Sequence, residues 1–141
     1  MAISETEQSL SLSPRNINIK KKAASIYLQL AEIDPTKIIE THKNLSEAIN
    51  LSPTDPQLYY ELGLTLIKMG EKDLALAMFE KSIELKPNYT RPRYMKAILL
   101  IEKGSYEEAK KELEYILEKI SPKDERVKKL LKKLDEQNLP R

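Results

Sequence analysis

Apolar residues recur three and four positions apart along most of the chain, the spacing that gathers them on one face of an α-helix. This periodicity is absent from residues 1–16, which are rich in Ser, Glu and Gln. The pattern predicts a disordered N-terminal lead over 1–16 and a first helix from Ile17 or Lys20 to Ile33. Further helices are expected over about 36–51, 56–69 and 72–85, and again up to residue 137.

Signals for helix starts and stops punctuate this pattern. Three residue pairs combine an N-cap side chain with a proline at the first helical position, where the missing N–H is not needed. They are Asp34-Pro35, Asp55-Pro56 and Ser121-Pro122. Gly70 is placed to end a helix in the left-handed conformation, and Ser105 and Glu108 have the spacing of a capping box.

Residues 56–89 carry a specific arrangement of large, small and punctuating residues. Its members are Tyr59, Leu62, Gly63, Leu66, Ala75, Phe79 and Pro87. Their spacing resembles the tetratricopeptide repeat, with Tyr and Leu where that family has Trp and Tyr. Gly63 inside a helix costs about 1 kcal/mol relative to alanine, a cost that the close approach of a second helix explains.

Neighbouring segments repeat this arrangement at an interval of about 34 residues. Residues 22–55 form a degenerate repeat, in which Leu45 matches Phe79 but Gln29 replaces the glycine. Residues 90–123 form a third repeat, although Arg93 and Lys96 stand where the central repeat has Tyr59 and Leu62. In 122–137, one apolar stripe with a charged back is typical of a capping helix. The stripe consists of Val127, Leu130, Leu131 and Leu134.

The resemblance implies an all-α fold, a tetratricopeptide-like α-α superhelix formed as a single domain over 17–137. About seven helices are expected, as three antiparallel pairs and the C-terminal capping helix. The 141-residue chain is long enough for such a core, and its composition favours helix.

Charge and hydropathy limit the partners. The formal net charge is +2, and the longest apolar run, residues 97–101, is far shorter than the roughly 20 residues that span a bilayer. The lysines of 128–133 are diluted by Glu125, Asp135 and Glu136 and lack interleaved aromatics, so they are interpreted as a solvated helix face. We therefore expect a cytoplasmic chain with no nucleic-acid partner and no membrane insertion.

Candidate catalytic chemistry is sparse. His42 is the single histidine, cysteine is absent, and the three glycines are isolated, so neither a metal site nor a phosphate loop is indicated. Glutamates alternate with lysines at helical spacing, which is typical of solvated ion pairs. The sequence predicts no enzyme, no cofactor and no bound metal.

The resemblance places the binding surface on the first helix of each repeat, the A helix, at its second, fifth, ninth, twelfth and thirteenth positions. The predicted partner-binding residues are Gln57, Tyr60, Leu64, Ile67, Lys68, Arg91, Tyr94, Ile98 and Ile101, with Glu102 beside them. Family members that grip a C-terminal carboxylate use Lys and Asn at set groove positions. Here those positions hold Ile26, Leu30, Glu61 and Met95, and only Arg91 fits, which disfavours that mode.

The function implied is a non-catalytic protein–protein interaction or scaffold module that binds a peptide or helix of a partner protein in the concave groove of the A helices. Three alternatives stay open: a homo-oligomer whose apolar groove is its own interface, the soluble repeat tail of a larger membrane-associated protein, and a cryptic enzyme or nucleic-acid binder, which the residues support least. Filling of the groove by residues 1–20, by the last helix or by a second copy is weighed equally against a peptide ligand.

Overall fold

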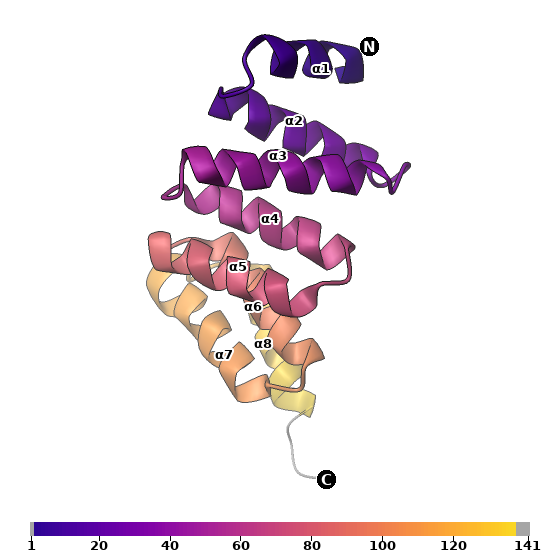
Figure 1. The fold of residues 1–141 in the computed structure, drawn as a ribbon. Coiled ribbons are helices and arrows are strands. Elements are labelled where there is room, and N and C mark those ends of the chain that lie inside the picture. Colours follow the sequence, from indigo (N-terminus) through magenta and orange to yellow (C-terminus); the bar gives the residue numbers. More distant parts are fainter. Residues whose placement is uncertain (1, 138–141) are drawn as a thin grey trace. The chain divides into compact units, whose positions relative to one another are not determined.

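The helices expected from the apolar periodicity are present, together with one at the N-terminus that the periodicity does not indicate. The computed structural model describes residues 2–137, with side chains over 3–136. The helices are α1 Ala2–Leu12, α2 Ile17–Leu30, α3 Lys37–Leu51, α4 Pro56–Lys68, α5 Lys72–Leu85, α6 Thr90–Glu102, α7 Tyr106–Tyr115 and α8 Glu125–Gln137 (Figure 1). A π-helical turn, η1 Ile116–Ile120, continues α7. Residues 2–137 contain no strand, which confirms the all-α prediction.

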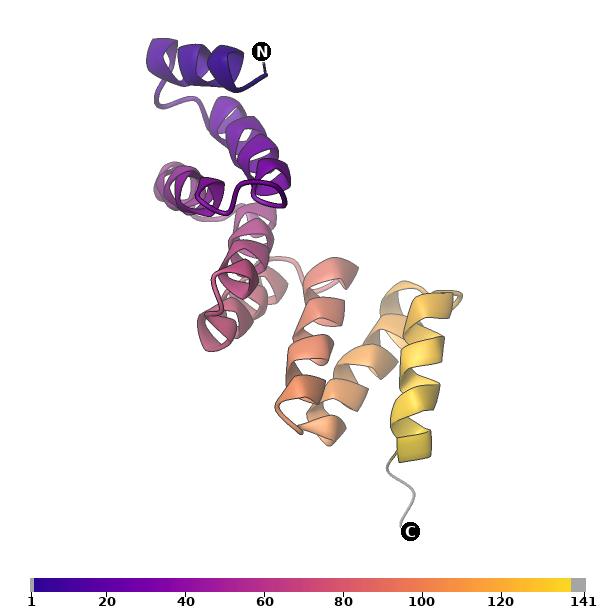
Figure 2. The ribbon, with the colours of Figure 1, turned by 90° about the vertical axis from the view of Figure 1, so that its right-hand side faces the viewer.

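The chain divides into two compact units inside α5, between Met78 and Phe79. In the first unit, α1 to α4 stack in chain order and each helix packs on the next (Figure 1). In the second unit, α7 packs against both α6 and α8 (Figure 2).

Small residues bring the helices of the first unit together. Ala23, Ala24 and Ala48 are fully or almost fully buried, and Leu45 and Leu58 complete the core around them. Alanine adds little bulk at a crossing, so two helix backbones can approach closely there. The core of this unit therefore fixes which faces of α2 and α4 point inward.

Residues 2–12 form a helix, which corrects the prediction of a disordered lead over 1–16; Met1 lies outside the described residues. Ile3, Thr6 and Leu10 make a sparse stripe at helical spacing, and Thr6 is buried. α1 packs on α2. Tertiary packing therefore orders a segment whose composition alone indicates disorder.

The helix-start predictions are confirmed at one site and corrected at three. Asp55 caps α4 by accepting a hydrogen bond from the Gln57 N–H at 3.0 Å, with Pro56 at the first helical position. Asp34 instead accepts the N–H and hydroxyl of Thr36 in a turn, so α3 begins at Lys37, and these hydrogen bonds lower the pKa of Asp34.

The other two corrections lie in the second unit. α8 begins at Glu125 rather than at Ser121-Pro122, because Asp124 accepts the N–H groups of Arg126 and Val127. The Ser105 side chain makes no cap hydrogen bond, so the predicted capping box does not form.

A charged cluster replaces apolar packing between α6 and α7. Arg93 and Lys96 both pair with Glu112, at 2.5 and 3.0 Å, and all three side chains are at most 19% exposed. The Arg93 guanidinium carbon also lies 3.8 Å from the centre of the Tyr115 ring. Burial lowers the pKa of Lys96, but the hydrogen bonds and charges of Glu112 and Glu80 outweigh it and raise that pKa overall. The two basic residues at apolar repeat positions thus share one largely buried carboxylate, and Glu80 is a second partner of Lys96.

We expect Glu112→Met alone to reduce the free energy of unfolding by roughly 3 kcal/mol, since it leaves two half-buried cations without their carboxylate. The triple variant Arg93→Tyr, Lys96→Leu, Glu112→Met should be at least as stable as the wild type. It restores Tyr59, Leu62 and Met78, the residues of the preceding repeat. Urea unfolding followed by circular dichroism measures both values.

The matched control is Glu80→Met, because Glu80 also pairs with Lys96 but is 54% exposed and should contribute less than about 1 kcal/mol. If the losses of unfolding free energy from Arg93→Tyr, Lys96→Leu and Glu112→Met simply add in the triple variant, the three charged side chains do not stabilise one another as described.

Gly70 ends α4 with φ of 83°, and Gly104 ends α6 with φ of 79°. No atom lies within 4 Å of a Cβ added at Gly70, so only the backbone conformation opposes a side chain. We expect Gly70→Ala to cost about 1 kcal/mol of unfolding free energy and Gly70→Asn to cost less. Thermal melts of the two variants test this; an alanine variant as stable as the wild type would contradict it.

Candidate partner-binding surface

The A helix of the central repeat, α4, presents its predicted binding residues opposite its buried stripe. Leu58, Leu62, Thr65 and Leu66 are buried. Tyr60, Leu64 and Ile67 are half-buried, while Gln57 and Lys68 at the two ends are exposed. The first unit therefore brings five of the predicted residues onto one helix face, apolar in the middle and polar at the ends.

The polar residues at the two ends of the α4 face are paired with neighbouring side chains. Gln57 Nε2 donates to Glu61 Oε1 at 2.7 Å, and Lys68 pairs with Glu32. Burial raises the pKa of Glu61, although the Gln57 hydrogen bond and the charge of Lys21 act in the opposite direction. Glu61, at the edge of the α4 face, is therefore harder to ionise in the folded state than in the unfolded state.

The A helix of the repeat 90–123, α6, follows the same plan. Pro92, Ala97, Leu99 and Leu100 are buried. Tyr94, Ile98 and Ile101 are half-buried and Arg91 is exposed. The equivalents of Tyr60, Leu64 and Ile67 thus have the same character in the second unit.

α8 belongs to the same series of A helices but is displaced by one residue. α6 begins 34 residues after α4, whereas α8 begins 35 residues after α6. The third helical position is buried in all three helices, as Leu58, Pro92 and Val127. The π turn η1 lies between α7 and α8, where an extra residue can be accommodated.

This displacement changes which residues of α8 match the binding positions. The second, fifth and ninth residues of α8 are Arg126, Lys129 and Lys133. A uniform interval of 34 selects Glu125, Lys128 and Lys132 instead. The sequence-based interpretation placed Lys129 and Lys133 on a solvated helix face and did not align them with the binding positions. The spacing of 35 between Pro87 and Pro122 is the signal for that alignment.

A shallow hollow of about 240 Å³ lies between α6 and α8 in the second unit. It is lined by Tyr94, Arg126, Lys129, Leu130 and Lys133. The Arg126 guanidinium carbon lies 5.8 Å from the centre of the Tyr94 ring, and Arg126 also pairs with Asp124 at 3.0 Å. The last helix therefore contacts one predicted binding residue, Tyr94, and leaves a basic hollow beside it.

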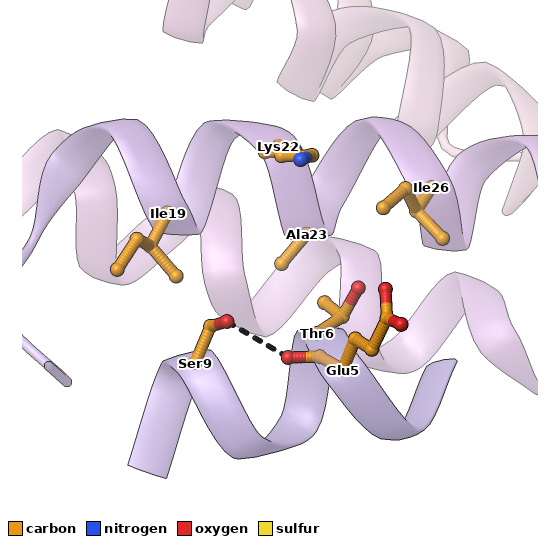
Figure 3. A pocket seen from close by; sticks show the side chains of 7 residues that line it. All are labelled: Glu5, Thr6, Ser9, Ile19, Lys22, Ala23 and Ile26. Atoms are coloured by element: carbon orange, nitrogen blue, oxygen red, sulfur yellow. Dashed lines mark hydrogen bonds between the residues drawn. The ribbon is translucent and has the colours of Figure 1, made fainter. Parts of the chain in front are cut away.

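A second hollow, of about 310 Å³, lies between α1 and α2 (Figure 3). Its lining residues are Glu5, Thr6, Ser9, Ile19, Lys22, Ala23 and Ile26. The Ser9 hydroxyl donates to the Glu5 backbone carbonyl at 2.8 Å, so it is used within α1. Lys22 and Glu5 are exposed at the rim. This hollow has the features of loose packing under a polar helix.

Over the residues that the structure describes, no group of three His, Cys, Asp or Glu side chains is arranged to hold a metal ion. None of the helices within residues 2–137 combines the length and apolarity required to cross a membrane.

Sequence profiles of one family match the chain in two overlapping places. A tetratricopeptide repeat profile matches residues 56–89, and another matches residues 73–134. The chain belongs to the tetratricopeptide repeat family. The family's helical-repeat fold, predicted from the residues of 56–89, is thereby confirmed, and that fold is generally a non-catalytic interaction module.

The chain is similar to part of a much longer protein, the peroxisomal targeting signal receptor of Kluyveromyces lactis. The two are 26% identical over 113 residues, which is 68% of this chain and 20% of the receptor. The chain spans a fifth or less of the length of each curated relative that it matches.

Solved tetratricopeptide structures share the fold at low sequence identity. MamA superposes with a TM-score of 0.82 at 21% identity, over 96% of this chain and 76% of MamA. The Yersinia enterocolitica type III secretion chaperone SycD, in complex with a peptide of the translocator YopD, has a TM-score of 0.71 at 22% identity. That match covers 84% of this chain and 94% of SycD.

The raised pKa of Glu61 leads to a stability prediction. Its unfolded pKa is near 4.5 and its folded pKa is higher, so the folded state holds the proton more tightly and loses stability as pH rises through that interval. We expect Glu61→Gln to melt at a higher temperature than the wild type at pH 7. The difference should vanish below about pH 4.5, where Glu61 is protonated in both states.

Paired thermal melts from pH 3 to 8 measure this difference, and Glu71→Gln, at an exposed site, serves as the control. A stabilisation by Glu61→Gln that persists unchanged at the acid end would refute the burial explanation.

Proposed function

We propose that this tetratricopeptide chain is a non-catalytic protein-interaction module that binds a peptide or helix of a partner protein. The outward face of α4 in the first unit and that of α6 in the second each offer a contact surface for it. The observation that carries the proposal is the matching pair of half-buried apolar faces. Tyr60, Leu64 and Ile67 recur as Tyr94, Ile98 and Ile101 at the same helical positions.

Tyrosine suits such a role because it offers a large contact area with few rotatable bonds to immobilise. Isoleucine and leucine beside it supply the apolar surface that an amphipathic helix or extended apolar peptide buries. Both tyrosines are half-buried, so their rings are partly held by the fold before a partner arrives. Such preorganisation reduces the entropy lost on binding.

Related proteins support the general role. SycD was solved with a translocator peptide, and the Kluyveromyces lactis relative is named as a targeting signal receptor. We transfer from them only the capacity to bind a protein segment.

Selection of a phage-displayed random peptide library on the immobilised wild-type chain tests the proposal. We expect selected peptides to bind the wild type and to lose about tenfold or more in affinity with Tyr60→Ala or Tyr94→Ala, as is usual for a tyrosine at the centre of an interface. Fluorescence anisotropy with the synthetic peptides measures the loss. Tyr106→Ala is the matched control, because Tyr106 is 39% exposed at the start of α7, away from the A helices.

Two results would overturn the proposal. One is a selection that enriches no binder, and the other is a set of binders that Tyr60→Ala and Tyr94→Ala leave unaffected. Light scattering of the free chain belongs to the same experiment, because self-association that Tyr60→Ala and Tyr94→Ala abolish would identify a second copy as the partner.

A further inference from the structure

The charges of α8 are divided unevenly between its faces. Each acidic side chain at or near this helix is paired with a basic residue. The pairs are Asp124–Arg126, Glu125–Lys128, Lys110–Asp135 and Lys132–Glu136, at 3.0, 2.8, 2.7 and 3.9 Å. Arg126 holds the pKa of Asp124 below its usual range, so this carboxylate stays ionised and offsets the charge of Arg126.

Lys129 and Lys133 receive no such compensation from residues 3–136, whose side chains the structure describes. They lie four residues apart, so they share one face of α8 and repel each other. Both line the hollow that Tyr94 and Leu130 complete. The hollow thus joins two uncompensated cations to an aromatic ring and an aliphatic side chain.

The position of this hollow connects it to the proposed binding surface. Lys129 and Lys133 are the fifth and ninth residues of α8, the places held in α6 by Tyr94 and Ile98. Tyr94 belongs both to the α6 face and to the hollow. A ligand that lies on the α6 face and continues past Tyr94 therefore meets the two lysines.

We propose that this hollow binds an acidic segment of the partner, with carboxylates on Lys129 and Lys133 and an adjacent aliphatic side chain against Tyr94 and Leu130. This inference rests on the proposed function and adds the chemistry of the ligand. A volume of about 240 Å³ accommodates a few side chains rather than a single small anion. Charge complementarity selects carboxylates, and Leu130 selects a ligand with apolar groups beside them.

Nucleic acid fits this site less well. Non-specific binding of a single strand relies on successive aromatic platforms in a basic groove, and Tyr94 is the one aromatic among the residues that line the hollow. The chain as a whole has a formal charge of only +2. A peptide with alternating acidic and apolar residues matches the lining better than a phosphodiester backbone does.

The peptides selected on the wild-type chain supply the probe. We expect them to be enriched in Asp and Glu, and we expect Lys129→Gln with Lys133→Gln to weaken their binding about tenfold at low ionic strength. The matched control removes the same two charges from another face of the same helix, as Lys128→Gln with Lys132→Gln, and should leave the affinity unchanged. A second probe is the same peptide with each Asp replaced by Asn and each Glu by Gln. Its affinity for the wild type should be about as low as the affinity of the acidic peptide for the variant with Lys129→Gln and Lys133→Gln.

Three outcomes would overturn the inference. They are selected peptides without acidic enrichment, equal losses in the two double variants, and tighter binding of a fluorescein-labelled oligothymidine than of the peptide. Failure of the proposed function is distinguishable, because it leaves either no selected binder or binders that both Tyr60→Ala and Tyr94→Ala leave unaffected. Some binders could be weakened by Tyr60→Ala and left unaffected by Lys129→Gln with Lys133→Gln. That result would overturn the inference about the acidic segment and leave the proposed function intact.

Discussion

The rotation of each A helix about its own axis depends on one buried stripe. Leu58, Pro92 and Val127 occupy the third position of α4, α6 and α8, and each is buried. Returning a side chain of this kind to water costs about 1.5–3 kcal/mol, so the helix cannot turn to present another face. The residues opposite the stripe are consequently held outward, and the composition of that outward face is free to vary.

The second unit shows that apolar repeat positions accept charge when the partners change together. Arg93 and Lys96 occupy positions that are Tyr59 and Leu62 in the central repeat, and Glu112 stands where that repeat has Met78. A buried ion pair of this kind adds little stability over apolar packing, but removing one member is costly. Such a cluster makes α6 and α7 specific for each other, since neither would pack well against the apolar equivalent.

Much of the fold could be predicted from the sequence, because helical periodicity and the 56–89 spacing are local properties of the chain. The starts of α3 and α8 could not be predicted in this way. Each depends on which backbone N–H groups donate to Asp34 or to Asp124, and the sequence does not specify those hydrogen bonds. α1 escaped prediction because its order comes from α2. Among the proposed binding residues, those on α4 and α6 follow from the repeat, whereas Lys129 and Lys133 do not, since a uniform interval of 34 residues passes over them.

The π turn at Ile116–Ile120 has a consequence for anyone who extends or recombines this protein. A new repeat could be joined to this chain by placing its first helix a fixed 34 residues after Thr90. That helix would then be rotated about its axis by about 100° from the orientation of α8, because one residue corresponds to about 100° in an α-helix. A graft aligned on the cap at Asp124 would retain the phase. The number of residues between repeats is therefore a poor guide to helix orientation in this chain, and a new repeat is better aligned on the Asp124 cap.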